Sequence, residues 1–419
     1  MSRYKAYPEY KDSGIEWLGL IPATWELKPL KFMAKIRNGQ DYKVVEVDEG
    51  YPVIGSGGQF TYASTYTYAK ESVLLGRKGT IDKPLYINEP FWTVDTMYYT
   101  EINEDIYPKF LYYLAITIQF ARYSTNTALP SMTQEHLGNY RFAIPVESNE
   151  RKKIANFLDH ETAKIDTLIA KQQELIKLLK EKRQAVISHA VTKGLNPNAP
   201  MRDSGVEWLG EVPAHWEIQK FKHMFEIRKR IAGELGYDVL SITQKGIKIK
   251  DIESGDGQLS MDYSKYQIVE KGDFAMNHMD LLTGFVDISM FDGVTSPDYR
   301  VFALSDENSV PEYFLCYLRM GYLNRIFFPF GQGAATIGRW RLPTEAFNEF
   351  PAPKPPKDEQ RQISEFIQRT IAHMELVEEK ATFAIQVMKE RRTALISAAV
   401  TGKIDVRDWQ PPSESAIAA

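Results

Sequence analysis

The distribution of apolar residues predicts two long helices. In residues 149–193 the apolar positions alternate in steps of four and three, which is the pattern of a coiled-coil seam, and residues 357–401 repeat it. The predicted seam residues are Ile154, Leu158, Ile165, Leu168, Leu175, Leu179 and Val186 in the first helix and Ile363, Ile367, Met374, Val377, Ala381, Ala384, Met388 and Leu395 in the second. Because a globular region separates the helices along the chain, we expect them to pack against each other antiparallel.

Short β-type runs and Gly-rich turns precede each long helix. The runs lie at residues 43–47, 72–75, 84–87 and 96–100 in the first half and at 239–242, 267–269, 286–290 and 300–304 in the second. Each half also has one helical pattern, at 108–122 and 311–327, whose aromatic stripe is typical of a buried core. The fold class is therefore α+β.

The two halves of the chain repeat each other. Residues 12–19 (DSGIEWLG) return as residues 203–210 (DSGVEWLG), and the helix ends at 181–192 and 390–401 also match. The offset between equivalent residues grows from 191 at Trp17 and Trp208 to 209 at Ile154 and Ile363. A period of about 200 residues is the size of a domain rather than of a solenoid repeat. Sequence divergence is thus concentrated inside each half.

This organisation predicts two similar mixed domains and two spacer helices. We expect a first domain at 1–148, a helix at 149–194, a linker and second domain at 195–356, a second helix at 357–405 and a C-terminal tail at 406–419. A duplicated scaffold whose centres diverge is typical of a protein that does one task at two different targets.

Composition and motifs exclude several classes of protein. The net charge of −4 provides no overall basic field, so a DNA-binding surface has to be a local cluster of charge. The single cysteine, Cys316, excludes a disulfide framework and a thiolate metal cluster. None of the seven histidines has zinc-ligand spacing, and there is no P-loop. We therefore expect a binding protein without metal, cofactor or catalysis.

The chain also lacks the patterns of membrane insertion and secretion. Residues 1–10 are polar and have no apolar core, and no apolar run reaches 18 residues. We expect a cytoplasmic protein.

Polar and basic residues in both halves are candidates for DNA binding. The Gly76-Arg-Lys-Gly-Thr80 sequence places two cations in a loop whose glycines allow close approach to a phosphate or a guanine edge, although an ordinary hairpin turn would look similar. The candidates are Lys43, Arg77, Lys78, Thr80, Asn126, Ser131 and Gln134 in the first half and Arg228, Lys229, Arg230, Gln244, Lys245, Asn277, His278, Gln332, Thr336, Arg339 and Arg341 in the second. Each alone could be a solvated surface side chain, and their recurrence in both halves favours DNA binding.

Together these motifs resemble the specificity subunit of type I restriction-modification systems over essentially the whole chain. The repeated lead-in, the 76–80 loop followed by Pro90-Phe-Trp92 and Asp95-Thr96, the Glu-Gln-Arg opening of the second long helix and its ending at 395–404 carry the resemblance. The second half departs from it at Ala275-Met-Asn-His278, where the first half has Leu74-Leu-Gly-Arg77. The second half therefore lacks a Gly-Arg-Lys-Gly loop.

The resemblance implies a division of labour among subunits. Each domain would read one half of a split site in double-stranded DNA, and the antiparallel helices would set the spacing between the halves. The helices would also dock two methyltransferase subunits, which use S-adenosylmethionine to methylate adenines, and motor-nuclease subunits would join the fuller complex. Two alternatives remain at this point: a stand-alone DNA-modifying enzyme, and a coiled-coil scaffold that does not bind DNA.

Overall fold

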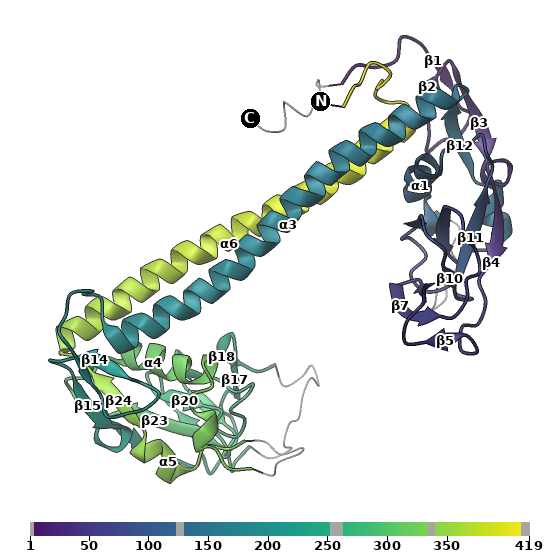
Figure 1. Cartoon of the computed structure of the whole chain (residues 1–419). Helices are drawn as coiled ribbons and strands as arrows, with labels where there is room; N and C mark the ends of the chain where they lie inside the picture. The colour runs from purple at the N-terminus through teal and green to yellow at the C-terminus, as the bar shows by residue number, and fades with distance from the viewer. Residues whose placement is uncertain (1–3, 123–129, 252–262, 334–339, 412–419) are drawn as a thin grey trace. The chain divides into compact units, whose positions relative to one another are not determined.

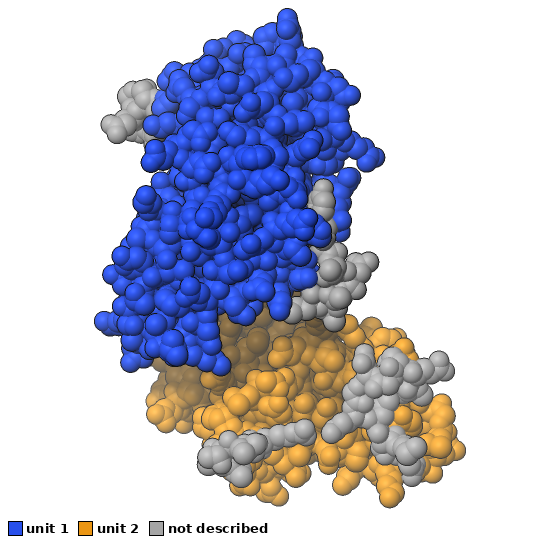
Figure 2. Space-filling view, turned by 90° about the vertical axis from the view of Figure 1, so that its right-hand side faces the viewer, with its two compact units in different colours: residues 1–173, 382–419 blue, residues 174–381 orange. Residues whose placement is uncertain are grey.

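The computed structural model describes residues 4–122, 130–251, 263–333 and 340–411, and it divides into two compact units (Figure 2). Unit 1 comprises residues 1–173 and 382–419, and unit 2 comprises residues 174–381. Each unit therefore contains one mixed domain together with part of each long helix. Many of the elements of each unit are labelled in Figure 1.

Unit 1 is built from short, mostly antiparallel sheets and the helices α1 and α2, together with its parts of the long helices. Its paired strands are β1 (Tyr10–Asp12) with β2 (Leu20–Pro22) and β3 (Trp25–Pro29) with β12 (Arg141–Pro145). The central sheet has the order β4 (Ala34–Asn38), β11 (Met97–Ile102), β8 (Ser72–Gly76), β9 (Leu85–Ile87), and the second sheet has the order β10 (Trp92–Thr93), β6 (Tyr51–Gly55), β7 (Gly58–Ala63), β5 (Glu46–Val47). The helices are α1 (Pro108–Ile116) and α2 (Gln134–Asn139), and Leu30–Phe32 and Phe120–Arg122 are single 3-10 turns.

Unit 2 repeats the central sheet and the two lead-in strand pairs, but two separate strand pairs stand in place of the second sheet. It has the pairs β13 (Met201–Asp203) with β14 (Glu211–Pro213), β15 (Glu217–Lys220) with β24 (Pro351–Lys354), β17 (Leu240–Thr243) with β18 (Gly246–Ile249), and β19 (Gln267–Val269) with β22 (Gly293–Thr295). Its central sheet has the order β16 (Phe225–Ile227), β23 (Arg300–Leu304), β20 (Phe274–Met276), β21 (Val286–Ile288). Helices α4 (Pro311–Leu323) and α5 (Thr344–Glu349) and the 3-10 turns Phe221–His223 and Phe328–Phe330 complete it.

The same kind of helix closes the core of each unit. Helices α1 and α4 both start with a proline in the first turn, where the missing N–H has no intrahelical partner to lose. Phe110 of α1 and Phe314 of α4 are fully buried in their respective cores. Each core also contains a fully buried lead-in tryptophan, Trp25 in unit 1 and Trp216 in unit 2.

The long helices are α3 (Ser148–Lys193) and α6 (Lys357–Val400), and they lie side by side in each unit (Figure 1). In unit 1 Arg392 forms an ion pair with Asp166 at 2.9 Å. In unit 2 Arg183 pairs with Glu375 at 3.0 Å, and Lys180 with Glu378 at 3.3 Å. From Lys180 to Arg183 the residue number in α3 rises by three, whereas that of the α6 partner falls by three, from Glu378 to Glu375. The helices are therefore antiparallel, as expected. The repeat offset of 209 carries Asp166 onto Glu375 and Arg183 onto Arg392, so the two ion pairs are equivalent.

The predicted seam is correct for α6 and partly wrong for α3. The seam residues of α6 are all buried or partly buried, whereas Leu168 and Leu175 of α3 are 50% and 36% exposed. The neighbouring Ile169 and Ile176 are less exposed. At both places two apolar residues are adjacent, and a spacing of three or four from the preceding seam position fits either one.

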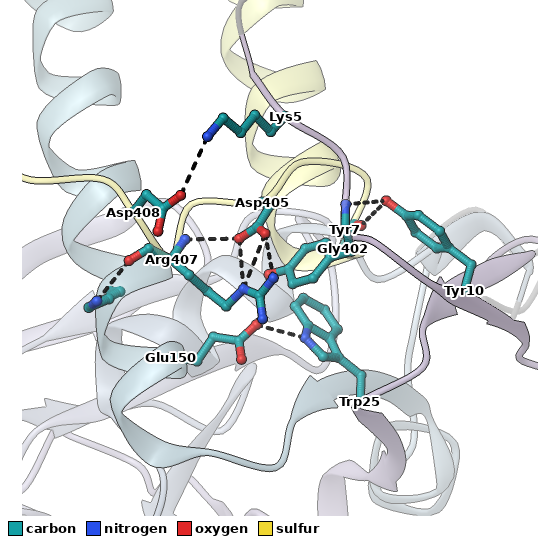
Figure 3. Close-up of polar contacts among 10 residues, drawn as sticks. Lys5, Tyr7, Tyr10, Trp25, Glu150, Gly402, Asp405, Arg407 and Asp408 are labelled. Atoms are coloured by element: carbon teal, nitrogen blue, oxygen red, sulfur yellow. Dashed lines mark hydrogen bonds and ion pairs between the residues drawn. The ribbon is translucent and has the colours of Figure 1, made fainter.

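The two lead-ins join the long helices through the same contact (Figure 3 shows that of unit 1). The indole Nε1 of Trp25 donates to Glu150 at 2.9 Å, and that of Trp216 donates to Glu359 at 3.0 Å. A second donor differs, since Tyr7 Oη contacts Glu150 at 2.8 Å and His215 Nε2 lies 2.8 Å from Glu359.

Residues 404–409, which follow helix α6 and include the start of the expected C-terminal tail, are packed against unit 1. The Asp405 carboxylate accepts hydrogen bonds from the Arg407 guanidinium, which lies 5.0 Å from the centre of the Tyr7 ring (Figure 3). Val406 is buried, and Trp409 packs edge-on against Phe157 at 5.6 Å. This segment therefore belongs to the core of unit 1.

The predicted β-type runs all contain strands, and some bounds differ. The run at 43–47 is reduced to β5, and the helical patterns at 108–122 and 311–327 end at residues 116 and 323. The structure also contains strands that were not predicted, among them β3, β4, β6, β7 and β12 of unit 1. The helices α2 and α5 were not predicted either, because six residues give too few positions to show a helical period. Within the described ranges, no helix is both long enough and apolar enough to cross a membrane.

Candidate nucleic-acid interface

The loop after β8 in unit 1 brings together candidates that are far apart in the sequence. The Arg77 carbonyl accepts a hydrogen bond from Met132 N at 3.0 Å, and Gly79 N donates to the carbonyl of Pro130 at 3.1 Å. Lys78 and Ser131 form an antiparallel bridge. Residues 77–80 and 130–134 thus form one surface, which we call the first edge.

Arg77 is held in place by the first edge while remaining partly exposed. Its Nη1 donates to the Asp95 carbonyl at 3.2 Å, and its guanidinium lies 5.9 Å from the centre of the Tyr98 ring. The Tyr98 hydroxyl donates to the carbonyl of Met132 at 3.1 Å. Tyr98 therefore contacts both segments of the edge, and the Arg77 guanidinium next to its ring stays partly exposed to solvent.

The remaining candidates of unit 1 have different surroundings. Lys78 and Gln134 are exposed, and Gln134 Nε2 donates to Asn38 Oδ1 at 3.1 Å. Thr80 is partly exposed within the loop. Lys43 lies in an exposed turn before β5, in the other sheet. Asn126 lies outside the described residues.

Unit 2 has the same main-chain frame at residues 277–281 and 340–342, the second edge. Leu342 N donates to the carbonyl of His278 at 2.9 Å, as Met132 N does to Arg77. Tyr98 is paired with Leu75 on β8, which is two residues before Arg77. Arg300 is paired with Met276 on β20, which is two residues before His278. Arg300 Nη2 donates to the Leu342 carbonyl at 3.0 Å. His278 is therefore the counterpart of Arg77, and Arg300 that of Tyr98.

The two edges differ in the burial of their arginine, which is partly exposed in unit 1 and buried in unit 2. His278 and Arg300 are only 5% and 4% exposed. Burial and the nearby Arg300 and Arg341 lower the pKa of His278 to about 3, so its ring is neutral at physiological pH. Burial also lowers the pKa of Arg300 to about 10, which leaves it charged, and it lies 4.6 Å from the centre of the Phe347 ring. The cation is at the surface in unit 1 and beneath it in unit 2.

Exposed polar residues surround the buried cation of the second edge. Gln332 and Arg341 exchange two main-chain hydrogen bonds of 2.8 and 2.9 Å, and both side chains are exposed. Gln244 and Lys245 occupy the β17–β18 turn, and Gln244 Nε2 donates to the carbonyl of Thr283 at 3.3 Å. These four residues are thus grouped with the 277–284 loop. Thr336 and Arg339 lie outside the described residues.

Comparisons with known proteins agree with the duplicated fold. A family model described as the type I restriction modification DNA specificity domain matches residues 22–178. The chain is 21% identical over 429 residues to the EcoDI specificity subunit of Escherichia coli, covering 94% of this chain and 91% of that one. It is also 21% identical over 457 residues to the EcoBI specificity subunit of Escherichia coli, with coverages of 98% and 92%. The chain belongs to the family of type I restriction-modification specificity subunits.

Two solved structures show the same fold at 12% identity. The HsdS subunit from Thermoanaerobacter tengcongensis has a TM-score of 0.54, with 94% of this chain and all of that chain covered. A chain from a study of complex assembly and conformational transition of the type I system has a TM-score of 0.65, with coverages of 91% and 98%. Specificity subunits are the non-catalytic DNA-recognition components of these systems, so the chain is a recognition subunit.

In this specificity subunit three basic candidates lie away from the second edge. Arg228 donates to Asp273 Oδ1 at 2.9 Å, and Arg230 pairs with both Asp273 and Glu270. Asp273 precedes β20, whereas the second edge follows it, and its side chain is only 2% exposed. A buried carboxylate needs cationic partners, which accounts for both arginines. Lys229 is exposed between them.

Two further features complete the account of candidate groups. Asn277 holds the turn of the second edge, since its carbonyl accepts a hydrogen bond from Tyr322 at 2.7 Å and its side chain accepts one from Met279 N at 3.3 Å. In the described part of the chain, no group of three or more acidic, histidine or cysteine residues could hold a metal ion. Sequence reasoning missed Tyr98 and Arg300, because only the strand register shows that they support the two loops.

Proposed function

We propose that each unit of this specificity subunit reads one half of a bipartite site in double-stranded DNA. The observation that carries the proposal is the main-chain frame that the two edges share. Met132 N donates to the Arg77 carbonyl in unit 1 and Leu342 N to the His278 carbonyl in unit 2, while the side chains at these positions differ. A retained frame keeps the way of docking on DNA, while changed side chains alter which bases are read.

We assign the DNA contacts to the exposed and partly exposed side chains of each edge. In unit 1, Arg77 and Lys78 meet phosphates or guanine edges, and Gln134 and Ser131 supply neutral hydrogen-bonding groups. In unit 2, Lys245 and Arg341 supply the exposed charge. His278 is buried and Arg228 and Arg230 are paired with acids, so we give them structural roles instead. Gln332 and Gln244 complete the second edge, and Asn126, Thr336 and Arg339 remain expectations from the sequence.

The helices α3 and α6 set the distance between the two half-sites. A helix of 46 residues is roughly 69 Å long at 1.5 Å per residue, which corresponds to about 20 base pairs. The matched ion pairs Asp166–Arg392 and Glu375–Arg183 support a single register for the pair of helices. We expect the spacing of the half-sites to follow the helix length.

The long helices also carry apolar side chains suited to docking two methyltransferase subunits. Leu178 is 51% exposed and Val387 is 44% exposed, and the offset of 209 makes them equivalent positions of the repeat. Exposed apolar groups at equivalent positions favour two copies of one partner. Motor-nuclease subunits would join the same assembly in the cytoplasm.

Mapping of methylated adenines tests the bipartite site. DNA from cells that express this chain with its methyltransferase subunits should carry methyladenine in a motif of two short parts separated by unspecified bases. Arg77→Ala should relax one part of the motif and Arg341→Ala the other, because each residue belongs to one edge. A continuous motif, or one variant that alters both parts, would contradict the proposal.

Shortening the helices tests the spacer. Removing residues 170–176 from α3 and 382–388 from α6 preserves the seam period and the ion-pair register. Seven residues amount to about 10 Å, so the gap in the methylated motif should shrink by about three base pairs. An unchanged gap would refute the spacer role.

The rival functions give different results with the purified chain. A stand-alone DNA-modifying enzyme would transfer labelled methyl groups from S-adenosylmethionine, or cleave DNA with magnesium and ATP, without added subunits. A scaffold that does not bind DNA would leave the pattern of footprints on the mapped site unchanged when added to the methyltransferase. We expect no turnover by the chain alone and two separated footprints with the methyltransferase present.

A further inference from the structure

The turn between β6 and β7 of unit 1 has a counterpart in unit 2 that lies at the second edge. Both hairpins close with two residues, because Gly55 pairs with Gly58 across the turn in unit 1 and Thr243 pairs with Gly246 in unit 2. The residue after each turn is a glycine with nearly the same positive φ, 103° at Gly58 and 101° at Gly246. Residues 56–57 therefore correspond to residues 244–245.

The β6–β7 turn lies at the same end of its sheet as the first edge. Strands β6 and β10 run parallel, so their carboxyl ends share one side. Val94, just after β10, donates its N–H to the Ile54 carbonyl at 3.2 Å, and the next residue, Asp95, accepts the hydrogen bond from Arg77. The strand that leads into the turn is thus connected to the loop that carries Arg77.

The chemistry of the two turns differs. Unit 2 has Gln244 and Lys245, whose side chains extend from the main chain, whereas unit 1 has Ser56 and Gly57. The turn of unit 1 also lies closer to an equivalent side-chain contact on its leading strand. A threonine hydroxyl binds the strand two residues before the turn in unit 1, at Ile54, and four residues before it in unit 2, at Leu240. A partner that touches the unit 1 turn has to come close to its main chain, because the only side chain there is that of Ser56.

Nothing in the fold of unit 1 requires a glycine at position 57. Gly57 is exposed, its φ lies outside the left-handed region, and a Cβ built there would have no atom within 4 Å. Gly58 differs, because its positive φ favours glycine. A glycine that the fold does not need suits a surface where another molecule comes close to the backbone. The main-chain amides of Ser56 and Gly57 take no part in the hydrogen bonds found among the described residues.

We propose that the turn formed by Ser56 and Gly57 contacts a phosphate of the DNA backbone through its main-chain N–H groups and the Ser56 hydroxyl. This inference rests on the proposed function and adds a contact to the first half-site. Phosphate contacts fix the register of a protein on the duplex, so this turn would orient the first edge over its bases. Unit 2 makes the equivalent contact with the side chains of Gln244 and Lys245.

Bulk added at position 57 tests the contact. Gly57→Leu fits the free protein without strain, so its melting temperature should match that of the original chain. With the methyltransferase subunits present, its affinity for a duplex carrying the mapped site should fall at least about tenfold, which is about 1.4 kcal/mol. Hydroxyl-radical protection should weaken in one half-site and persist in the other. Gly57→Ala should show a smaller loss in the same half.

Thr65→Leu is the matched control. Thr65 is exposed just beyond the other end of β7, and this change adds an apolar side chain to unit 1 away from the turn. It should bind DNA as the original chain does. If Gly57→Leu binds as tightly as Thr65→Leu, the inference is overturned. If the original chain with its partners does not bind the site, the proposed function itself fails, so the two failures are distinguishable.

Discussion

The first and second edges share one main-chain frame, but the positions of the cationic side chain and the aromatic ring are exchanged between the loop and the strand. Unit 1 has Arg77 on the loop above the Tyr98 ring, and unit 2 has the neutral His278 ring on the loop and the Arg300 cation on the strand. In each unit the strand residue donates to the same carbonyl of the neighbouring segment, that of Met132 or Leu342. The comparison teaches that support for the loop is retained while the charge presented at the surface changes.

The largest expected effect comes from placing a cation at both positions of unit 2. His278→Arg would put a second guanidinium beside buried Arg300, for which no ion pair appears among the described residues. We expect a loss of more than about 3 kcal/mol in the free energy of unfolding, because an unpaired buried charge is costly. Chemical denaturation of the full chain measures this loss.

The double substitution sharpens the comparison. Adding Arg300→Tyr to His278→Arg recreates the arrangement of unit 1, in which a tyrosine supports an arginine on the loop. We expect the second change to restore at least about 1 kcal/mol, although Arg300→Tyr alone should destabilise the protein. Additive losses in this double-mutant cycle would show that the exchange between the two units is not a coupled one.

A smaller effect is expected from pH, and it arises at the second edge, where His278 titrates, rather than at the first edge, where Arg77 does not. The pKa of His278 is about 3 in the folded protein and close to 6.5 when the chain is unfolded. Between these values the unfolded chain binds the proton and the folded protein does not, so stability is complete above pH 6.5 and falls as the pH is lowered. The slope contributed by this residue is at most about 1.4 kcal/mol per pH unit.

Amide hydrogen exchange localises the pH effect. The Leu342 amide should lose protection below pH 6.5 more steeply than the equivalent Met132 amide, whose acceptor belongs to Arg77. His278→Leu should remove the difference, because it leaves the main-chain hydrogen bond and deletes the titrating ring. Equal pH dependence of the two amides would contradict the claim that His278 makes only the second edge sensitive to pH.

The sequence predicted the frame of the molecule better than its reading surfaces. The long helices, their antiparallel packing and the α6 seam followed from periodicity sustained over about 45 residues. The strands of the second edge are three to five residues long, and Arg300 appeared only as part of an apolar run. Burial of His278 and the use of Arg228 and Arg230 by Asp273 depend on tertiary contacts, which no local pattern encodes.

The smallest expected effect is on the salt dependence of DNA binding. Lys78 and Lys245 are exposed cations of the first and second edges, and no ion pair of either appears among the described residues. Each that meets a phosphate releases about one counterion, so Lys78→Ala and Lys245→Ala should each lower the slope of log affinity against log salt by about one. Arg230→Ala is the control, because its guanidinium pairs with Glu270 and Asp273, and it should leave the slope unchanged. A change in slope for Lys78→Ala alone would mean that the turn of unit 2 does not meet a phosphate, so the correspondence between the two turns would not extend to DNA binding.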